Sequence, residues 1–210
     1  APAVSLEEEL ARVLPVVREA VRLNVPISVD TYKASVMQAV LDAGADIIND
    51  VWALRQAGSQ QVVVASHPSC GVCLMHMHGE PQTMQTLPMQ GSVIHTVTEF
   101  LHGHAQALQT SGVAHERIAL DPGVGFGKTV AQNFELLAHQ NELLSLGYPL
   151  LVGWSRKSSI GAVTGCDVDE RMAPSVAAAL LAVERGARVV RVHDVAQTVQ
   201  ALQVWQAAQV

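Results

Sequence analysis

Polar side chains recur at the ends of short apolar segments in this sequence. Asp30, Asn49 and Asp121 each stand at such an end. Carboxylate and amide groups there can hydrogen-bond a flat ring with alternating donors and acceptors, such as a pterin or a purine edge. The competing interpretation is that a strand-end Asp only caps the helix that follows it. That interpretation weakens when several such residues lie on one rim of a sheet.

A second set of side chains is cationic. The sequence Ser-Arg-Lys-Ser at 155–158 follows an apolar segment, and Arg191 and His193 stand at the end of the last one. As alternate residues of a strand, Arg191 and His193 would share one face. Because Arg clamps phosphate oxygens in pairs, this set predicts a phosphate or diphosphate site. The alternative is a structural ion pair with Asp121 or Asp194.

The loop at 121–129, DPGVGFGKT, is rich in glycine. It ends in Gly-Lys-Thr like a Walker A loop, but Pro122 stands where that motif needs its first glycine, and the dinucleotide fingerprint is not met either. The glycines let the backbone approach a ligand closely, and Phe126 could cover an aromatic ring. A mobile loop without a ligand is the alternative.

These residues lie in a chain that alternates apolar strands with amphipathic helices. Segments such as ADIIND and PLLVG are apolar almost throughout, which is typical of a parallel sheet covered by helices. Ser5 and Glu8 form the S-x-x-E pattern of a helix start. Because polar residues follow strand after strand, a TIM barrel fits better than an open sheet with one switch point. We predict strands at 25–30, 45–51, 72–77, 117–121, 149–154 and 188–193, and helices at 5–23, 33–43, 92–111, 133–146, 171–185 and 195–209.

Composition excludes several classes of protein. The chain has 210 residues, of which 49% are hydrophobic and 15% charged, so we predict one globular domain at 1–210 rather than a disordered chain or a coiled coil. The net charge of −6 argues against a general nucleic-acid or anionic-membrane surface. No apolar run reaches the roughly 18 residues of a membrane span.

The cysteines and lysines are few. Three cysteines make no disulfide framework and indicate a reducing cytoplasm. The C-x-x-C at 70–73 enters a strand instead of opening a helix, which argues against a redox role. All three lysines follow predicted strand ends; we expect Lys33 and Lys128 to border the site and Lys157 to act in catalysis.

Six segments together resemble the dihydropteroate synthase family of folate biosynthesis. They follow the family's order: ISVDT (27–31), ADIINDV (45–51), VCLMHMHGEPQTMQ (72–85), LDPGVGFGK (120–128), LLVGWSRKS (150–158) and RVHDV (191–195). The resemblance implies a TIM (β/α)8 barrel and a transferase (EC 2.5.1.15). Such an enzyme joins 6-hydroxymethyl-7,8-dihydropterin diphosphate to p-aminobenzoate and releases pyrophosphate.

The resemblance also implies a role for each site residue. Lys157, Arg191 and His193 are the implied catalytic residues. Lys157 matches the lysine at the junction of the two substrates, and Arg191 matches the arginine that packs on the pterin face. The implied pterin-binding residues are Asp30, Asn49, Asp121, Lys157 and Arg191; those for p-aminobenzoate are Phe126 and Ser158; those for the diphosphate are His193 and Arg156.

Further properties follow from the same resemblance. It implies Mg²⁺ as Lewis acid, small-molecule substrates, a cytoplasmic homodimer and a sulfonamide target, with no nucleic-acid or membrane partner. The family's metal-binding Asn loop and its Thr-Arg-Pro-Gly loop belong to two βα units that would precede Ala1. We therefore expect this chain to hold the third to eighth units without a metal ligand of its own, and to be unable to catalyse or close its sheet alone.

Two other functions remain open. One is a methyltetrahydrofolate-binding methyltransferase domain that serves a corrinoid protein, which would need no diphosphate clamp. The other is a non-catalytic paralogue that keeps the fold. Binding of the pterin that depends on its diphosphate would argue against the first, and release of pyrophosphate would argue against the second.

Overall fold

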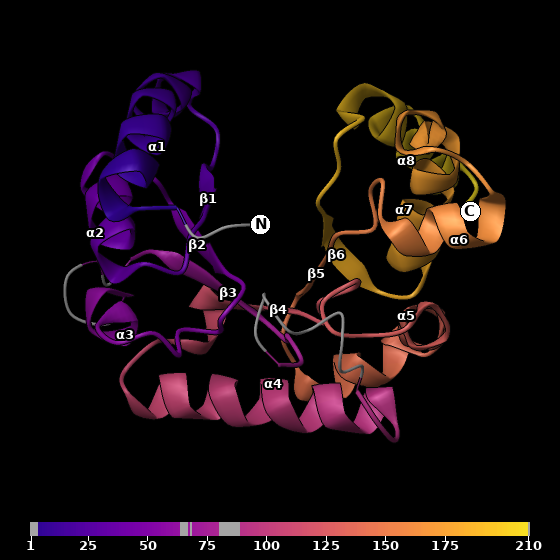
Figure 1. Ribbon diagram of the computed structural model, residues 1–210, viewed down its shortest axis with the longest axis horizontal. Coiled ribbons are helices and arrows are strands. Elements are labelled where there is room, and N and C mark those ends of the chain that lie inside the picture. Colours follow the sequence, from indigo (N-terminus) through magenta and orange to yellow (C-terminus); the bar gives the residue numbers. More distant parts are fainter. Residues whose placement is uncertain (1–3, 64–66, 68, 80–88, 210) are drawn as a thin grey trace. The chain divides into compact units, whose positions relative to one another are not determined.

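The computed structural model describes residues 4–63, 67, 69–79 and 89–209 (Figure 1). The chain forms two compact units. The first unit comprises Ala1–His76 and Glu99–Asp121, and the second comprises Met77–Thr98 and Pro122–Val210. The described residues hold six strands that alternate with helices. The predicted α/β class is therefore confirmed, and the prediction of one domain stays a prediction.

The first unit contains four parallel strands. Each strand pairs with the next one along the chain, in the order β1, β2, β3, β4. This order is the one that successive βα units produce. Its elements are α1 (Leu6–Ala20), β1 (Ser28–Asp30), α2 (Ala34–Asp42), β2 (Ile47–Asp50), α3 (Ser59–Gln61), β3 (Gly71–Met75) and β4 (Ile118–Asp121).

The register of these strands aligns their polar residues. Asp30 on β1 pairs with Asn49 on β2, and Asn49 pairs with Cys73 on β3. Met75 at the end of β3 pairs with Asp121 at the end of β4. Because neighbouring strands lie about 4.8 Å apart, the predicted pterin residues of the first unit gather at the carboxyl ends of its strands.

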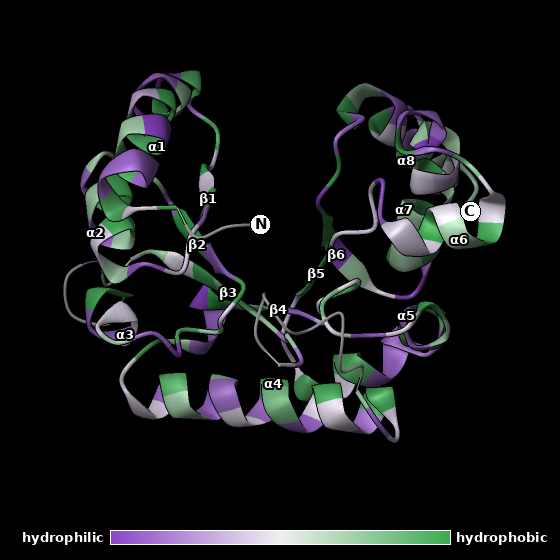
Figure 2. Ribbon diagram, in the orientation of Figure 1, coloured by the Kyte–Doolittle hydropathy of each residue, from purple (hydrophilic) through white to green (hydrophobic). Residues whose placement is uncertain are grey.

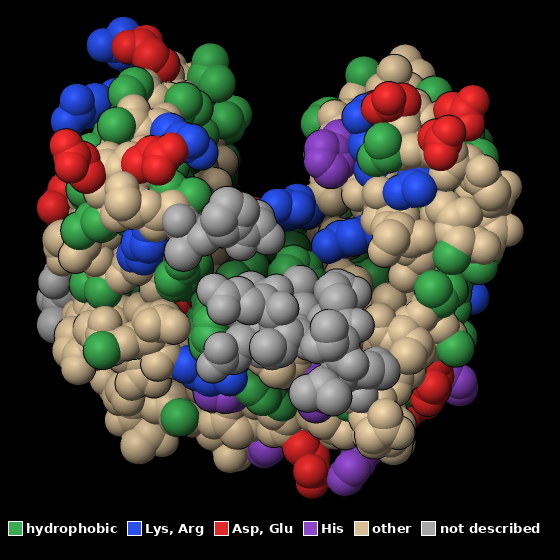
Figure 3. Space-filling view, in the orientation of Figure 1, with side chains coloured by type: hydrophobic (Ala, Val, Ile, Leu, Met, Phe, Trp, Pro, Cys, Tyr) green, Lys and Arg blue, Asp and Glu red, His purple; other side chains and the backbone are tan. Residues whose placement is uncertain are grey.

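Helix α1 begins where the S-x-x-E pattern predicts. The Ser5 hydroxyl accepts a hydrogen bond from the Glu8 N–H at 3.1 Å. The Glu8 carboxylate pairs with Arg12 one turn later instead of returning to the Ser5 backbone. Over α1, Figure 3 shows acidic, basic and hydrophobic side chains next to one another. The helix is thus amphipathic, with Val17 buried on its inner face.

The second unit contains β5 and β6, which pair in parallel with one irregularity in their register. Helices follow both strands, as in the first unit. Its elements are α5 (Val130–Ala138), the 3₁₀ helix Gln140–Leu146, β5 (Leu150–Val152), α6 (Ser158–Thr164), α7 (Met172–Glu184), β6 (Ala187–Val190) and α8 (Val195–Ala207).

Helix α4 (Val93–Thr110) contributes residues to both units, with the division after Thr98. Figure 2 shows hydrophilic and hydrophobic stretches alternating along it. The residues it buries recur at helical spacing, as expected for one inward face: Val93, Val97, Leu101, Ala105 and Leu108. No helix in the described ranges is long and apolar enough to cross a membrane.

Several predicted boundaries differ from the structure by a few residues, and two of them bear on the candidate site. Helix α5 begins at Val130, before the predicted start at 133, because Thr129 and Gln132 form a capping box that the prediction missed. Strand β6 ends at Val190, so Arg191 and His193 lie beyond it. The argument that these two side chains share a strand face therefore does not hold.

Candidate functional site

The first unit gathers hydrogen-bond acceptors at the carboxyl ends of its strands. The Asn49 amide nitrogen donates to the Asp30 carboxylate, and this bond fixes the orientation of the Asn49 side chain. The opposite atom, Asn49 Oδ1, is buried and accepts no hydrogen bond from any described residue. Asp121 is buried as well. A flat ligand with several N–H groups would match this set of acceptors.

Cys73 lies in the middle of this acceptor set. Burial raises the pKa of its thiol well above the ordinary value, and the negative charges of Asp121, Asp30 and Asp50 raise it further. Burial also raises the pKa of the Cys70 thiol, against an opposing contribution from Arg117. Both pKa directions disfavour a thiolate, so the 70–73 motif lacks the activated sulfur of a redox pair.

Asp50 holds the turn that follows β2. Its carboxylate accepts hydrogen bonds from the backbone N–H groups of Trp52 and Leu54, both at 2.8 Å. Within this turn Ala53 and Leu54 have φ of 51° and 57°, a conformation that costs about 1–2 kcal/mol per residue. Burial raises the pKa of Asp50 to about 6, against the opposing effect of these bonds and of Arg55. Asp50 therefore has a local structural role like the one expected of a capping Asp, but it holds a turn and not the start of a helix.

Lys33 serves the packing of α1 against the start of α2. Its ammonium lies 2.7 Å from the Glu9 carboxylate. The other oxygen of Glu9 accepts from the Thr31 hydroxyl at 2.7 Å. These bonds tie the residues after β1 to α1, which gives Lys33 a structural role.

In the second unit, the glycine-rich loop is held from inside. Lys128 is buried, and its ammonium donates to the carbonyl oxygens of Gly123 at 2.8 Å and Phe126 at 3.2 Å. A Cβ on Gly127, whose φ is +70°, would lie 2.4 Å from the carbonyl oxygen of His78. The loop is thus a packed segment, which argues against the mobile-loop alternative, and Lys128 supports it.

Asn133 links this loop to α6, and sequence reasoning missed it. Its Oδ1 accepts from the Gly125 N–H at 2.8 Å, and its Nδ2 donates to the Ser159 hydroxyl at 2.9 Å. The side chain is almost fully buried. Asn133 recurs at helical spacing with the buried Leu136 and Leu137, and a polar residue on that apolar face is the signal that could have identified it.

The structure brings Phe126 and Lys157 together. The Lys157 ammonium lies 4.4 Å from the centroid of the Phe126 ring. Ser158, the other residue predicted for p-aminobenzoate, follows Lys157 in the chain and begins α6, where it is exposed. These three residues therefore join a cation, a flat apolar surface and a hydroxyl within one unit.

Two successive residues after β5 bind two successive residues after β6. Ser155 contacts His193, with its Oγ 2.8 Å from the ring Nδ1 and 3.1 Å from the backbone nitrogen. Arg156 pairs with Asp194 through two bonds, of 2.8 Å and 3.3 Å. This pair raises the pKa of the Arg156 guanidinium and lowers that of the Asp194 carboxyl. The alternative of a structural ion pair with Asp194 thus applies to Arg156.

Arg191 follows β6 directly and is exposed. Its backbone N–H donates to the Val152 carbonyl at 3.0 Å, which extends the pairing of β5 and β6 by one residue.

The predicted site residues divide between the two units. Those of the second unit are Phe126, Arg156, Lys157, Ser158, Arg191 and His193, and those of the first unit are Asp30, Asn49 and Asp121. Of the segment at 72–85, residues 80–85 lie outside the described ranges.

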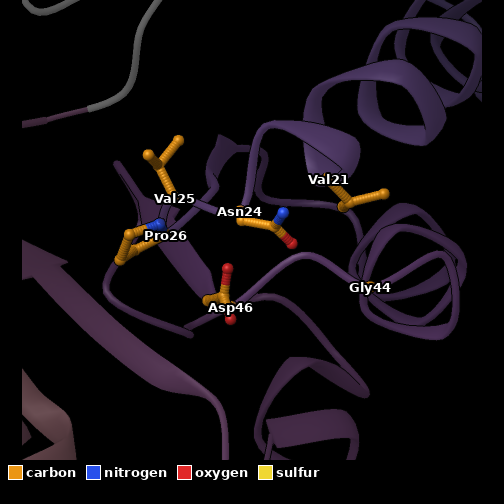
Figure 4. Close-up of a pocket in the computed structure, with 6 residues that line it drawn as sticks. All are labelled: Val21, Asn24, Val25, Pro26, Gly44 and Asp46. Carbon is orange, nitrogen blue, oxygen red and sulfur yellow. The ribbon is translucent and has the colours of Figure 1, made fainter.

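A pocket in the first unit lies at the opposite ends of the strands (Figure 4). Pro26 and Asp46, which line it, precede β1 and β2. The Asp46 carboxylate accepts from the Ile27 N–H at 2.8 Å and thereby joins the two strand entries. In parallel α/β folds, binding and catalytic residues lie at the carboxyl ends of the strands, so we assign this pocket no catalytic role.

Metal ligands do not cluster in the described parts of the chain. Within them, no group of three or more His, Cys, Asp or Glu side chains could hold a metal ion. These residues therefore offer no cage made of protein groups alone. Mg²⁺ commonly keeps water ligands and binds through one or two side chains together with substrate phosphates.

Comparison with known proteins first identifies the class of protein to which the chain belongs. The family model described as pterin binding enzyme matches residues 1–193. Dihydropteroate synthase of Haemophilus influenzae is 46% identical over 206 residues, which are 97% of this chain and 74% of that protein. The chain belongs to the dihydropteroate synthase family, as its six segments predict.

Solved structures agree with this assignment. Burkholderia cenocepacia dihydropteroate synthase, complexed with 7,8-dihydropteroate, is 53% identical with a TM-score of 0.92; the match covers all of this chain and 77% of that one. Yersinia pestis dihydropteroate synthase, in complex with a sulfonamide drug, is 41% identical with a TM-score of 0.96. The match covers 100% of this chain and 76% of that one. The family favours the synthase over the corrinoid methyltransferase alternative.

Proposed function

We propose that the protein that carries this chain performs the dihydropteroate synthase reaction with the residues described above. The amine nitrogen of p-aminobenzoate forms a bond to the methylene carbon of the pterin, the bond from that carbon to the diphosphate oxygen breaks, and a proton is released with pyrophosphate. The observation that carries this proposal is the buried Asn49 Oδ1, an acceptor oriented by Asp30 and bonded to no described residue.

We propose that Asp30, Asn49 and Asp121 bind the pterin ring. A pterin presents an exocyclic amino group and ring N–H groups, which need acceptors. A buried acceptor left without a donor costs about 1–3 kcal/mol, and a ring N–H would recover that cost. The carboxylates near Cys73 make the same region negative, which also favours a ring rich in donors.

Cations and an aromatic ring would lie where the new bond between the pterin and p-aminobenzoate forms. Departure of the diphosphate leaves a resonance-stabilised pterin methylene cation, so the protein must position its substrates and stabilise charge. We propose that Lys157 lies at the junction of the substrates and that Phe126 and Ser158 bind p-aminobenzoate. Arg191 would pack on the pterin face and His193 would bind the diphosphate.

Arg156 is a special case among the proposed diphosphate residues. Its guanidinium already holds two hydrogen bonds to Asp194. It would therefore reach the diphosphate only by sharing its remaining N–H groups. We propose that its first role is to fix the residues around His193 and Lys157, and that its contribution to diphosphate binding is secondary.

Several finer properties are proposed on the family resemblance. Mg²⁺ would act as a Lewis acid on the departing diphosphate, and a chelator should abolish turnover, which added Mg²⁺ should restore. The six βα units correspond to the third to eighth units of a TIM barrel. The protein would be a cytoplasmic homodimer, and sulfonamides would compete with p-aminobenzoate.

The direct test is the reaction itself. The complete protein that carries this chain is incubated with both substrates and Mg²⁺, and pyrophosphate and dihydropteroate are measured. We expect both products in equal amounts, and neither when p-aminobenzoate is omitted. No product with both substrates present would reject the enzyme and support a non-catalytic paralogue. An Asn49→Ala variant should weaken binding of the pterin diphosphate about tenfold, within the range for one buried hydrogen bond.

A further inference from the structure

One hydroxyl contacts His193 twice. The backbone N–H of His193 donates to Ser155 Oγ at 3.1 Å, and the ring Nδ1 of the same residue lies 2.8 Å from the same oxygen. Ser155 is 7% exposed, so water has little access to this hydroxyl. The two contacts close a small ring of bonds between residues that are 38 positions apart.

The protons at this hydroxyl can be counted. A serine hydroxyl has one hydrogen to donate and two lone pairs that accept. The backbone N–H can only donate, so it uses one lone pair. Within the described ranges, no group other than the His193 ring contacts Ser155 Oγ as an acceptor. The hydroxyl hydrogen therefore has one good destination, the lone pair of Nδ1.

We infer that Ser155 is a positioning residue that holds neutral His193 in the tautomer with its proton on Nε2. If the proton were on Nδ1, the hydroxyl would accept two hydrogen bonds while its own hydrogen lacked an acceptor. The inference rests on the proposed function, in which His193 binds the diphosphate. There, Nε2–H donates to a phosphate oxygen, whereas the other tautomer would present a lone pair to the anion.

The neighbouring ion pair supports this geometry. Arg156 and Asp194 join the same two segments one residue further along. The backbone N–H of Arg156 donates to the Ser175 hydroxyl at 2.9 Å, and the Thr198 hydroxyl donates to the backbone carbonyl of Asp194 at 2.9 Å. Both segments are thus anchored to the helices that follow, α7 and α8. Ser155 and His193 are held at hydrogen-bonding distance from both directions.

The tautomer can be read directly by nitrogen NMR. Long-range proton–nitrogen spectra of ¹⁵N-labelled protein are recorded about two pH units above the ordinary histidine pKa of about 6.5, where imidazoles are neutral. A His193→Asn variant assigns the signals. We expect the Nε2–H pattern in the wild type and in Ser155→Thr, and a shift toward the Nδ1–H form in Ser155→Ala. The Nδ1–H pattern in the wild type, or an unchanged pattern in Ser155→Ala, would overturn the inference.

Binding of inorganic pyrophosphate tests the consequence. We expect Ser155→Ala to weaken binding about 3- to 10-fold, in the range of one neutral hydrogen bond. Ser155→Thr should bind within about twofold of the wild type. Ser145→Ala is the matched control, because Ser145 is exposed and its hydroxyl donates only to the Glu142 carbonyl. It should leave binding unchanged.

A double-mutant cycle separates action through the ring from a general loss of structure. If Ser155 acts through His193, then Ser155→Ala should have no further effect in a His193→Ala background. An equal loss in both backgrounds would show that Ser155 acts by another route. If wild-type protein binds no pyrophosphate, the proposed role of His193 and the anion part of the inference both fail. The NMR measurement still decides whether Ser155 determines the tautomer of the His193 ring.

Discussion

The Lys157 ammonium lies over the Phe126 ring, 4.4 Å from its centroid. Gly125 lies beside the same lysine, and a Cβ there would meet Lys157 Cδ at 3.4 Å, an ordinary van der Waals contact, so the φ of +82°, not lack of space, favours glycine at this position. A cation over an aromatic face gains about 0.5–2 kcal/mol, depending on how far it is desolvated. The pair places a fixed positive charge beside a flat apolar surface, which suits an aromatic amine attacking an electron-poor carbon.

Replacement of Lys157 should affect turnover far more than stability. We expect Lys157→Ala to lower kcat by two orders of magnitude or more, since loss of one preorganised charged group costs about 3–4 kcal/mol in a transition state. Steady-state pyrophosphate release measures the effect. Arg188→Gln is the control, because Arg188 is an exposed cation of the same unit. Near-normal turnover of Lys157→Ala would refute the role of Lys157.

Two glycines should respond in opposite ways to alanine. Gly127→Ala combines a φ of +70° with a clash against the His78 carbonyl, so we expect a loss of at least about 2 kcal/mol in the free energy of unfolding. Gly103 lies within α4, and a Cβ there would meet nothing within 4 Å. Gly103→Ala should stabilise by about 0.5–1 kcal/mol. Urea unfolding checks both, and equal effects would contradict the packed loop.

Asn133 should prove important for both stability and substrate binding. Asn133→Ala removes the bonds to the half-buried Gly125 N–H and to the buried Ser159 hydroxyl, so we expect about 2–4 kcal/mol of destabilisation. The loop that carries Phe126 would shift, and KM for p-aminobenzoate should rise. Asn141→Ala, at an exposed position, should change stability by less than about 0.5 kcal/mol. If the two variants unfold alike, Asn133 does not anchor the loop.

The stability of the fold should carry a pH dependence from Asp50. Its pKa is raised to about 6 in the folded protein, from an ordinary value of 3.8. The folded state therefore binds this proton more tightly than the unfolded state, and the associated stabilisation is lost as the pH rises through about 6. Between pH 5 and 7.5 the loss is about 1–2 kcal/mol.

Asp50→Asn isolates that contribution, because every other group titrates alike in both proteins. The difference in unfolding free energy, wild type minus Asp50→Asn, should fall by this amount over the same pH range. Urea titrations at several pH values measure it. Parallel stability curves for the two proteins would show that Asp50 keeps an ordinary pKa in the fold.

Much of the fold could be predicted from local pattern. Apolar strands and capping residues predict the alternation of strands and helices, and the start of α1 at Leu6 follows from Ser5. Boundaries are less predictable where a side chain decides them. Thr129 and Gln132 cap each other and move the start of α5. The six family segments predict the family itself, which the comparisons confirm.

Contacts within the site were harder to predict. The ion pair of Arg156 with Asp194 was only one of the alternatives, because residue types do not reveal which of several charges meet. The contact of Ser155 with His193 joins segments that periodicity cannot relate. Lys128 shows the same difficulty: its place in a glycine-rich loop suggests a ligand, whereas its buried ammonium binds the loop's own carbonyls.

The burial of Cys73 makes its sulfur a reporter of folding. Alkylating reagents attack the thiolate, and both burial and the nearby carboxylates suppress that form in the folded strand. Cys166 is half-buried in a loop of the second unit. A mass tag should therefore label Cys166 in the folded protein and Cys73 only when β3 opens. The order of labelling would time the opening of the first unit without any engineered probe.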